Sequence, residues 1–151
     1  MRAVVQRVSQ ASVTVDGEVV GEIGTGLVVL VGVERDDELA DADVLADKVA
    51  ALRVFGDDRG GFERSVVDTG GGVLVVSQFT LLASMQRGRR PSFTSAAPGE
   101  EAEGAVEAVV ARLRHHGLTV ATGTFGAAMT VRLANEGPAT FLLDVRRGRV
   151  S

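Results

Sequence analysis

The sequence contains no cysteine, no tryptophan, no tyrosine and only two histidines in 151 residues. Without cysteine the chain forms no disulfide and offers no thiolate as a nucleophile or metal ligand. Without Trp or Tyr it lacks the usual stacking surfaces of single-strand nucleic-acid binders. No apolar run approaches the roughly 18 residues that span a bilayer. The sequence therefore argues against disulfide-stabilised, thiol-dependent and membrane-spanning proteins.

Side chains that usually carry catalysis or bind metals are also scarce. His115 and His116 are adjacent near the end of a predicted helix, whereas ligands on one helix face need a spacing of three or four. A Ser-His-Asp triad built on either has no support in the sequence. No zinc or calcium spacing occurs, and the glycines at 24–26 and 70–72 lack the pattern of a phosphate-binding loop. We expect neither a metal nor a cofactor.

The composition is that of one globular domain, with 45% apolar residues, 24% charged residues and a net charge of −4. An acidic balance argues against a sequence-independent nucleic-acid binder. Every basic residue except Lys48 is arginine. Residues 1–7 alternate between polar and apolar like a strand and lack the apolar segment of a signal peptide. We therefore expect a cytoplasmic protein.

Apolar periodicity predicts the order of secondary-structure elements. It predicts strands over 2–8, 12–15, 19–20, 27–33, 73–81, 118–122, 128–134 and 139–145. Helical spacing predicts helices over 39–52 and from Pro98 to Gly117. Asp16-Gly17 is a hairpin signal between two of the strands. This order predicts a single α/β domain over 1–151, with a mixed or antiparallel sheet rather than a doubly wound parallel one.

The stretch SQFTLLA, residues 77–83, ends an apolar run with polar side chains. Strand alternation would place Ser77 and Phe79 on one face of the sheet, and Gln78 and Thr80 on the other. Polar side chains at a strand end are common in any sheet. This stretch alone therefore does not define a site.

Two further stretches combine charge or small residues with apolar side chains. QRGRRPSF (86–93) packs three arginines into a predicted loop, which forms either a solvated surface or an anion contact. GTFGAAMTVRLANEGPAT (123–140) contains Phe125 and Met129, residue types more often buried in a core than used to bind ligands. Within it, Gly137-Pro138 breaks a run that otherwise predicts strand, which indicates a turn.

Together these stretches resemble one family, the D-aminoacyl-tRNA deacylases. SQFTLLA is similar to the Ser-Gln-Phe-Thr motif of that family, and NEGPAT (135–140) to its Asn-x-Gly-Pro-Val-Thr motif. The opening MRAVVQRVSQASVTVDGEVVGEIGTGLVVLVGV, the loop RGRRPSF and the segment GTFGAAMTVRLANEGPATFLLD also match, so the resemblance covers essentially the whole chain. Ala139 departs from the usual valine but removes no polar group, and we expect no loss of activity.

The resemblance implies a homodimer of a small, barrel-like α/β fold with its active sites at the subunit interface. Each site would combine the two motifs from different subunits. The implied reaction is hydrolysis of the ester between a D-amino acid and the 3′-terminal adenosine of tRNA, with removal of mischarged glycine as well. The expected partners are D-aminoacyl-tRNA and a second copy of the chain, without membrane or DNA.

The resemblance also implies a catalytic set. An aminoacyl ester is already activated, so a positioned water and an oxyanion hole suffice, each donor contributing ~3 kcal/mol. We assign the oxyanion hole to backbone N–H groups around Gln78 and Phe79, while Ser77 and Gln78 fix the ester or the amino group. Thr80 as nucleophile is the alternative, ranked second because the sequence supplies no base to activate its hydroxyl. The substrate's own 2′-OH could assist the water.

Gly137-Pro138 is the expected chiral filter. The resemblance implies a cis bond between them, with carbonyls that point into the partner's site. Such a main-chain wall excludes an L side chain and admits D-residues and glycine. Arg7, Asn135 and Thr140 are the expected supports of this wall.

Substrate contacts outside the catalytic set are expected in two places. Phe125, Gly126 and Met129 are candidates for the adenine pocket, partly through backbone contacts. Phosphates of the acceptor end would meet the loop arginines Arg87, Arg89 and Arg90.

Two other functions remain open from the sequence. A sister activity on the same fold removes L-alanine mischarged on tRNA, and it also uses a Gly-Pro pair. A non-catalytic module that binds a 3′-adenosine or an RNA end belongs to a different class. The residues of SQFTLLA fit the D-specific branch better than the L-alanine-specific one. The SQFT and GPAT stretches are intact, which argues against a site that has lost its catalytic residues.

Overall fold

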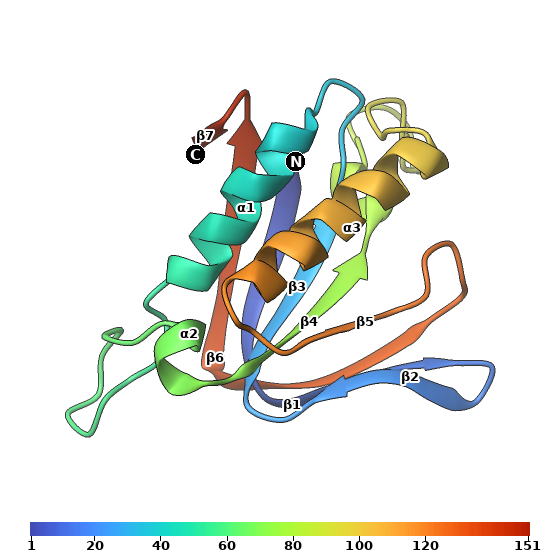
Figure 1. The fold of residues 1–151 in the computed structure, drawn as a ribbon. Coiled ribbons are helices and arrows are strands. Elements are labelled where there is room, and N and C mark those ends of the chain that lie inside the picture. The colour runs from blue at the N-terminus through green and yellow to red at the C-terminus, as the bar shows by residue number, and fades with distance from the viewer.

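One curled, mixed β-sheet forms the frame of the protein in a computed structural model that describes residues 1–151 (Figure 1). Its strands are β1 (Arg2–Val15), β2 (Glu18–Ile23), β3 (Gly26–Gly32), β4 (Gly72–Ser77), β5 (Val120–Thr122), β6 (Thr130–Arg146) and β7 (Arg149–Val150). The strand order is β5-β4-β3-β1-β6-β7, and β2 pairs with β1. Only the β3–β4 and β4–β5 pairs are parallel. The mixed, barrel-like sheet predicted from the sequence is confirmed as a half-barrel.

Both predicted main helices are present on one face of the sheet. They are α1 (Leu39–Ala51) and α3 (Gly99–His115), which lie side by side in Figure 1. At the start of α1, the Glu38 N–H donates to Asp41 Oδ2 at 3.1 Å, which gives a backbone amide at the helix start a partner. Pro98 precedes α3, where its missing N–H costs nothing.

A short third helix, α2 (Val66–Thr69), was not predicted. Ser65 and Asp68 form a reciprocal capping box at its start, with Asp68 N–H donating to Ser65 Oγ at 3.1 Å. This serine and acid three residues apart were the available signal. Gly70 ends the helix in the left-handed region, at φ 68°, which glycine adopts without strain.

The core is divided by the sheet. On the helix side, Leu45 and Val49 of α1 and Val109 and Leu113 of α3 are fully buried against it. The curl of the sheet encloses a second, smaller cluster on the other side. Its buried members are Val8, Ala11, Val13, Val28, Leu74 and Val76. No helix is long and apolar enough to cross a membrane.

The structure corrects two strand predictions. Residues 79–82 form a 3-10 helix, η1 (Phe79–Leu82), instead of continuing β4. The predicted alternation of faces therefore ends at Ser77. In the C-terminal region, the two predicted strands are one element, β6, whose register with β1 shifts opposite Arg7.

Helices α1 and α3 are joined by a surface ion cluster. Arg112 Nε and Nη2 donate to the two carboxylate oxygens of Asp47 at 2.7 and 3.0 Å, and His116 Nε2 lies 2.6 Å from Asp47 Oδ1. The bonds from Arg112 and then from His116 lower the pKa of Asp47 from 3.8 to about 2. His116 therefore pairs with a carboxylate, and neither His115 nor His116 lines the cavity described below.

Candidate functional site

The chain turns sharply where β4 ends. Ser77 is the last residue of β4, opposite Val31 of β3. The N–H of Gln78 donates to the Val31 carbonyl at 2.7 Å, which fixes the point at which the chain leaves the sheet. A Cβ at Gly32 would lie 3.1 Å from the Gln78 carbonyl oxygen, so a glycine there lets the turn pack closely.

This turn changes which backbone groups are free for an oxyanion hole. Because the Gln78 N–H is engaged by Val31, it is not a free donor, which corrects the sequence-based assignment to that group. Phe79 and Thr80 open η1, where no preceding turn supplies their N–H groups with carbonyl acceptors. The free backbone donors are therefore the N–H groups of Phe79 and Thr80, instead of those of Gln78 and Phe79 that the sequence predicted.

Thr80 is held by its neighbour rather than by a base. The side-chain amide of Gln78 donates to Thr80 Oγ1 in a very short hydrogen bond. An amide is not a general base, and it occupies a lone pair that a nucleophilic hydroxyl would use. The geometry around Thr80 therefore does not activate it.

A cavity of about 440 Å³ opens beside this turn. Its lining includes six of the predicted site residues: Ser77, Gln78, Phe79, Phe125, Gly126 and Met129. Thr80 is adjacent in sequence but does not line it. No side chain of the lining titrates, so the cavity carries hydrogen-bonding groups and apolar surface without a formal charge. The whole cavity is of the size and character of a small-molecule site.

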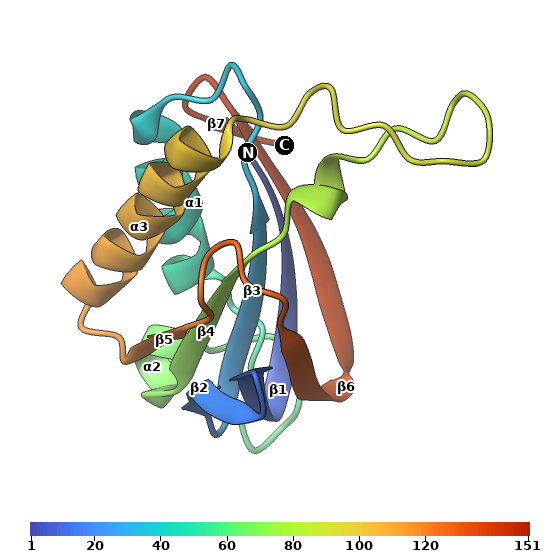
Figure 2. The ribbon, with the colours of Figure 1, turned by 90° about the vertical axis from the view of Figure 1, so that its right-hand side faces the viewer.

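The loop between β5 and β6 closes one side of the cavity. A Cβ at Gly123 would lie 2.5 Å from Met129 Sδ, so the glycine makes room for the methionine to fold back. Phe125 lies against the start of α3, with Cε1 4.0 Å from the position of a Cβ at Gly99. Figure 2 shows this loop rising beside β4 toward η1.

Small residues form the opposite wall, which the sequence analysis did not predict. Ala97 N–H donates to the Val33 carbonyl at 2.9 Å, which brings the segment before α3 down onto the end of β3. The additional small lining residues are Ala96, Ala97, Gly99 and Ala102. Their available signal was the run AAPGEEA, in which small residues flank a helix start.

The predicted arginine loop extends away from the body of the protein (Figure 2). Its base is pinched by Ser84 and Ser92, whose backbones exchange two hydrogen bonds of 2.8 and 2.9 Å. The side chains of Arg87, Arg89 and Arg90 are exposed and do not line the cavity. Phe93, just beyond the pinch, packs edge-to-face on Phe79 with ring centroids 4.9 Å apart, which links the loop to the cavity rim.

The Gly-Pro turn is a protrusion of β6. The bond between Gly137 and Pro138 is cis, as the resemblance implies, and Gly137 has φ 124°, a conformation that favours glycine. Asn135 closes the turn by accepting the Ala139 N–H at 2.9 Å and by donating to the Ala139 carbonyl at 3.1 Å. Asn135 Nδ2 also lies 3.2 Å from Thr140 Oγ1. The predicted supports Asn135 and Thr140 thus contact each other at the base of the turn.

Arg7 lies behind this turn. Its Nε donates to the Glu136 carbonyl at 3.1 Å and its Nη1 to the Val54 carbonyl at 2.6 Å. The position of a Cβ at Gly137 is 2.7 Å from Arg7 Nη2, so no other residue fits there without displacing the guanidinium. The structure brings the sequence-predicted support and the turn together.

Within one chain, the turn and the cavity are apart. Ser77 of β4 pairs with Val31 of β3, which pairs with Ala3 of β1. Ala3 in turn pairs with Leu143 of β6, whereas the turn of β6 lies opposite Arg7, four residues further along β1. This offset of four residues is about 13 Å along the strands, and three strand spacings add about 14 Å across the sheet. None of residues 135–140 lines the cavity. If both motifs serve one site, they must come from two copies of the chain.

Comparison with known proteins gives the same family over the whole chain. Residues 4–144 match the family described as D-Tyr-tRNA(Tyr) deacylase. The D-aminoacyl-tRNA deacylase of Heliobacterium modesticaldum is 57% identical over 148 residues, covering 98% of this chain and 99% of that protein. The protein of the same name from Anaeromyxobacter dehalogenans is 58% identical over 147 residues, covering 97% and 99%.

Solved structures share the fold. The structure described as c-Myc DNA Unwinding Element Binding Protein is 41% identical, with a TM-score of 0.90, and covers 97% of this chain and 99% of its own. A probable eukaryotic D-amino acid tRNA deacylase is 17% identical, with a TM-score of 0.85 over 95% and 98%, which shows the fold alone. The half-barrel, the cavity beside Ser77, Gln78 and Phe79, and the Gly-Pro turn are thus found in a chain that belongs to the D-Tyr-tRNA(Tyr) deacylase family.

Proposed function

We propose that this chain hydrolyses the ester bond between a D-amino acid and the 3′-terminal adenosine of tRNA, releasing the free D-amino acid and the tRNA. The observation that carries this proposal is the uncharged cavity beneath Ser77, Gln78 and Phe79, in a chain of this family. Glycine mischarged on tRNA is proposed as a second substrate, because it has no side chain for the turn to reject. A role in translation would place the protein in the cytoplasm.

Hydrolysis is proposed to use water rather than a protein nucleophile. The cavity contains no histidine, carboxylate or thiol, and an aminoacyl ester needs less activation than an amide. The N–H groups of Phe79 and Thr80 at the start of η1 have no carbonyl partner in a preceding turn, and they are proposed to stabilise the developing negative charge. Each such donor contributes about 3 kcal/mol to stabilisation of the transition state. Ser77 and Gln78 hold the ester or the substrate's amino group.

The adenosine end is proposed to bind in the apolar part of the same cavity. Phe125 and Met129 provide apolar surface, and Gly126, at φ 74°, leaves its backbone open to the ligand. Phosphates of the acceptor end are proposed to contact the exposed side chains of Arg87, Arg89 and Arg90. This local positive charge on a protruding loop offers an RNA contact on an otherwise acidic protein (Figure 2).

Chiral selection is proposed to come from the Gly137-Pro138 turn of a second copy. The turn is exposed in the single chain and is held from behind by Arg7 and Asn135. A wall of main-chain atoms rejects an L side chain by steric exclusion and is indifferent to the identity of a D side chain. The offset between turn and cavity within one chain supports a homodimer in which each site draws on both copies.

Parallel deacylation of D-Tyr-tRNA and L-Ala-tRNA tests the proposal. We expect rapid release of D-tyrosine and no acceleration for L-alanine. Hydrolysis of L-Ala-tRNA alone would assign the sister editing activity instead. Binding of a 3′-adenosine analogue with D-Tyr-tRNA left intact would assign a non-catalytic module.

A further inference from the structure

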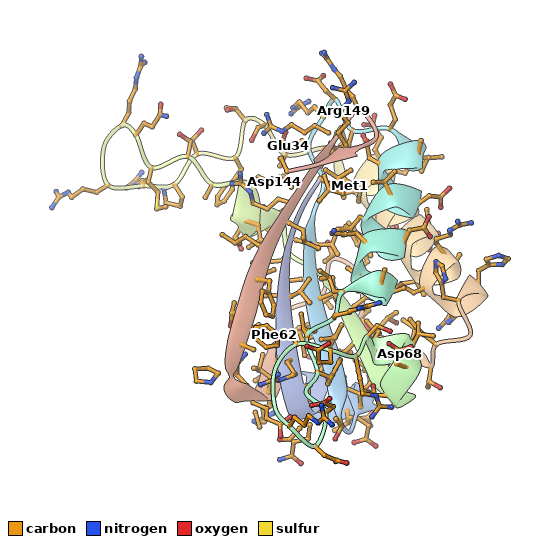
Figure 3. All side chains as sticks on the ribbon, turned by 90° about the vertical axis from the view of Figure 1, so that its left-hand side faces the viewer. Met1, Glu34, Phe62, Asp68, Asp144 and Arg149 are labelled. Carbon is orange, nitrogen blue, oxygen red and sulfur yellow. The ribbon has the colours of Figure 1, made fainter.

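Phe62 is a large apolar side chain on the protein surface, with 54% of its area exposed. It lies in the loop between α1 and α2, where that loop meets the sheet in Figure 3. Its ring packs edge-to-face on Phe141 of β6, with centroids 5.9 Å apart. On another side, the guanidinium carbon of Arg7 is 5.8 Å from the ring centroid, within the range of a cation–π contact.

The loop that carries Phe62 has a defined shape. Phe55 and Arg64 pair at its base, with Arg64 N–H donating to the Phe55 carbonyl at 3.0 Å. At its tip, Gly60 and Gly61 have φ 76° and 99°, and Gly60 N–H donates to the Asp57 carbonyl at 3.0 Å. These contacts return the chain toward β6, so the position of the Phe62 ring is set by the loop and not by the side chain alone.

Arg7 is consequently held from two separate parts of the chain. The loop side supplies the Val54 carbonyl and the Phe62 ring, and the turn side supplies the Glu136 carbonyl. A guanidinium on a long aliphatic stem has many rotamers, and a flat aromatic face restricts them. The same guanidinium occupies the space beside Gly137 that any side chain at that position would need.

We propose that Phe62 is a positioning residue for the chiral filter: its ring fixes the Arg7 guanidinium, and Arg7 fixes the carbonyl before Gly137-Pro138. This inference rests on the proposed function, because the selectivity in question is that of the proposed site for D- over L-aminoacyl-tRNA. Phe62 would influence that selectivity although it lies outside the site. Phe62 does not line the cavity beside Ser77 and Gln78. It lines a separate surface pocket together with Arg7 and Glu136, and its ring contacts the Arg7 guanidinium. Its effect reaches the substrate through Arg7.

The test compares Phe62→Leu, Phe62→Trp and the wild-type full-length chain. Leucine keeps apolar contact with Phe141 but removes the π face, whereas tryptophan restores it. Val67→Ala is the control, because it removes another half-exposed apolar side chain outside the proposed filter. Thermal unfolding first establishes that each variant is folded, as expected for substitutions at exposed positions.

Two readouts are measured on these proteins. The first is hydrogen exchange of the Arg7 Nε–H by NMR, which reports its bond to the Glu136 carbonyl without any substrate. The second is the ratio of kcat/KM for D-Tyr-tRNA to that for L-Tyr-tRNA. We expect exchange to quicken and the ratio to fall, each by about threefold, in Phe62→Leu, the size expected for loss of a partly exposed cation–π contact. Phe62→Trp and Val67→Ala should match the wild type.

Unchanged Nε–H exchange in Phe62→Leu would overturn the proposal. So would quicker exchange with an unchanged D-to-L ratio, or a fall in the ratio that Phe62→Trp shares. If the wild-type protein leaves D-Tyr-tRNA intact, the proposed function fails. In that case the exchange measurement still decides whether Phe62 positions Arg7.

Discussion

The side chain of Asn135 binds both backbone polar groups of Ala139: it accepts the Ala139 N–H at 2.9 Å and donates to the Ala139 carbonyl at 3.1 Å. Ala139 is buried, so these groups have little access to water. The three residues between them, Glu136 to Pro138, are exposed. One amide side chain therefore closes the turn, and the exposed part of the turn is free to contact another molecule.

Asn135→Ala should lower the free energy of unfolding by about 1–3 kcal/mol, because it leaves buried backbone groups of Ala139 without partners. Asn135→Asp keeps the acceptor for the Ala139 N–H but loses the donor, so its loss should be smaller at neutral pH. Urea unfolding of the three proteins measures this. Equal stability of Asn135→Ala and the wild type would show that water replaces the side chain.

Gly137→Ala should disrupt the turn, because φ is 124° there and the added Cβ would lie 2.7 Å from Arg7 Nη2. We expect a cost of about 1–3 kcal/mol in stability and at least a tenfold loss of D-Tyr-tRNA hydrolysis. Gly104→Ala is the matched control, since it lies inside α3 with nothing within 4 Å. That change should stabilise the protein by about 0.5–1 kcal/mol without affecting activity. Similar activity in the two variants would contradict the importance of the turn.

Thr80→Ala should retain kcat to within about tenfold, because the hydroxyl has an amide neighbour and no base. Removal of a true catalytic nucleophile costs about 10⁴-fold or more. Single-turnover deacylation of D-Tyr-tRNA at saturating enzyme separates this step from binding. A loss of the larger size in a folded, substrate-binding variant would make Thr80 the nucleophile.

Acid should destabilise the protein partly through Asp47. The folded-state pKa of this carboxyl is about 2, below its ordinary value of 3.8, because Arg112 and then His116 donate to it. A depressed folded pKa contributes stability that is present above pH 4 and is lost as the pH falls toward 2. The pair is more than a third exposed, so the effect should be about 1 kcal/mol.

Urea unfolding at pH 7 and pH 2.5 measures this contribution. Asp47→Asn should be less stable than the wild type at pH 7 and should lose less stability on acidification. Glu103→Gln, which removes an exposed carboxylate of α3 that acts on neither Asp47 nor Arg112, is the control. A wild type and an Asp47→Asn variant with the same pH dependence would show that the ion cluster adds no net stability.

The elements with strong periodicity were predictable from sequence. Helices α1 and α3 have apolar side chains at helical spacing and acids or proline at their starts, and the structure confirms both. The 3-10 helix at Phe79–Leu82 was not predictable in this way, because FTLL has the composition of a strand. Its turn depends on the tertiary bond from the Gln78 N–H to Val31, which local propensity does not encode.

The candidate site was predictable in its parts rather than in its arrangement. Motif resemblance identified Ser77, Gln78, Phe125 and Met129, and the fold places them around one cavity. The small residues of the opposite wall, such as Ala97, have no chemical signature and were missed. The coupling of Phe62 to Arg7 joins positions 55 residues apart, and only the curled sheet and the loop at 56–63 bring them together.

Mixing of two inactive variants tests most directly whether the cavity of one chain and the turn of another form one site. Gly137→Val disables the turn, and Ala102→Phe fills the cavity. Each is first shown to be folded and inactive on D-Tyr-tRNA, and the two are then co-expressed with different tags. With random pairing, half the dimers are mixed and each has one intact site, so we predict about a quarter of wild-type activity. Mixed dimers that remain inactive would contradict the shared site.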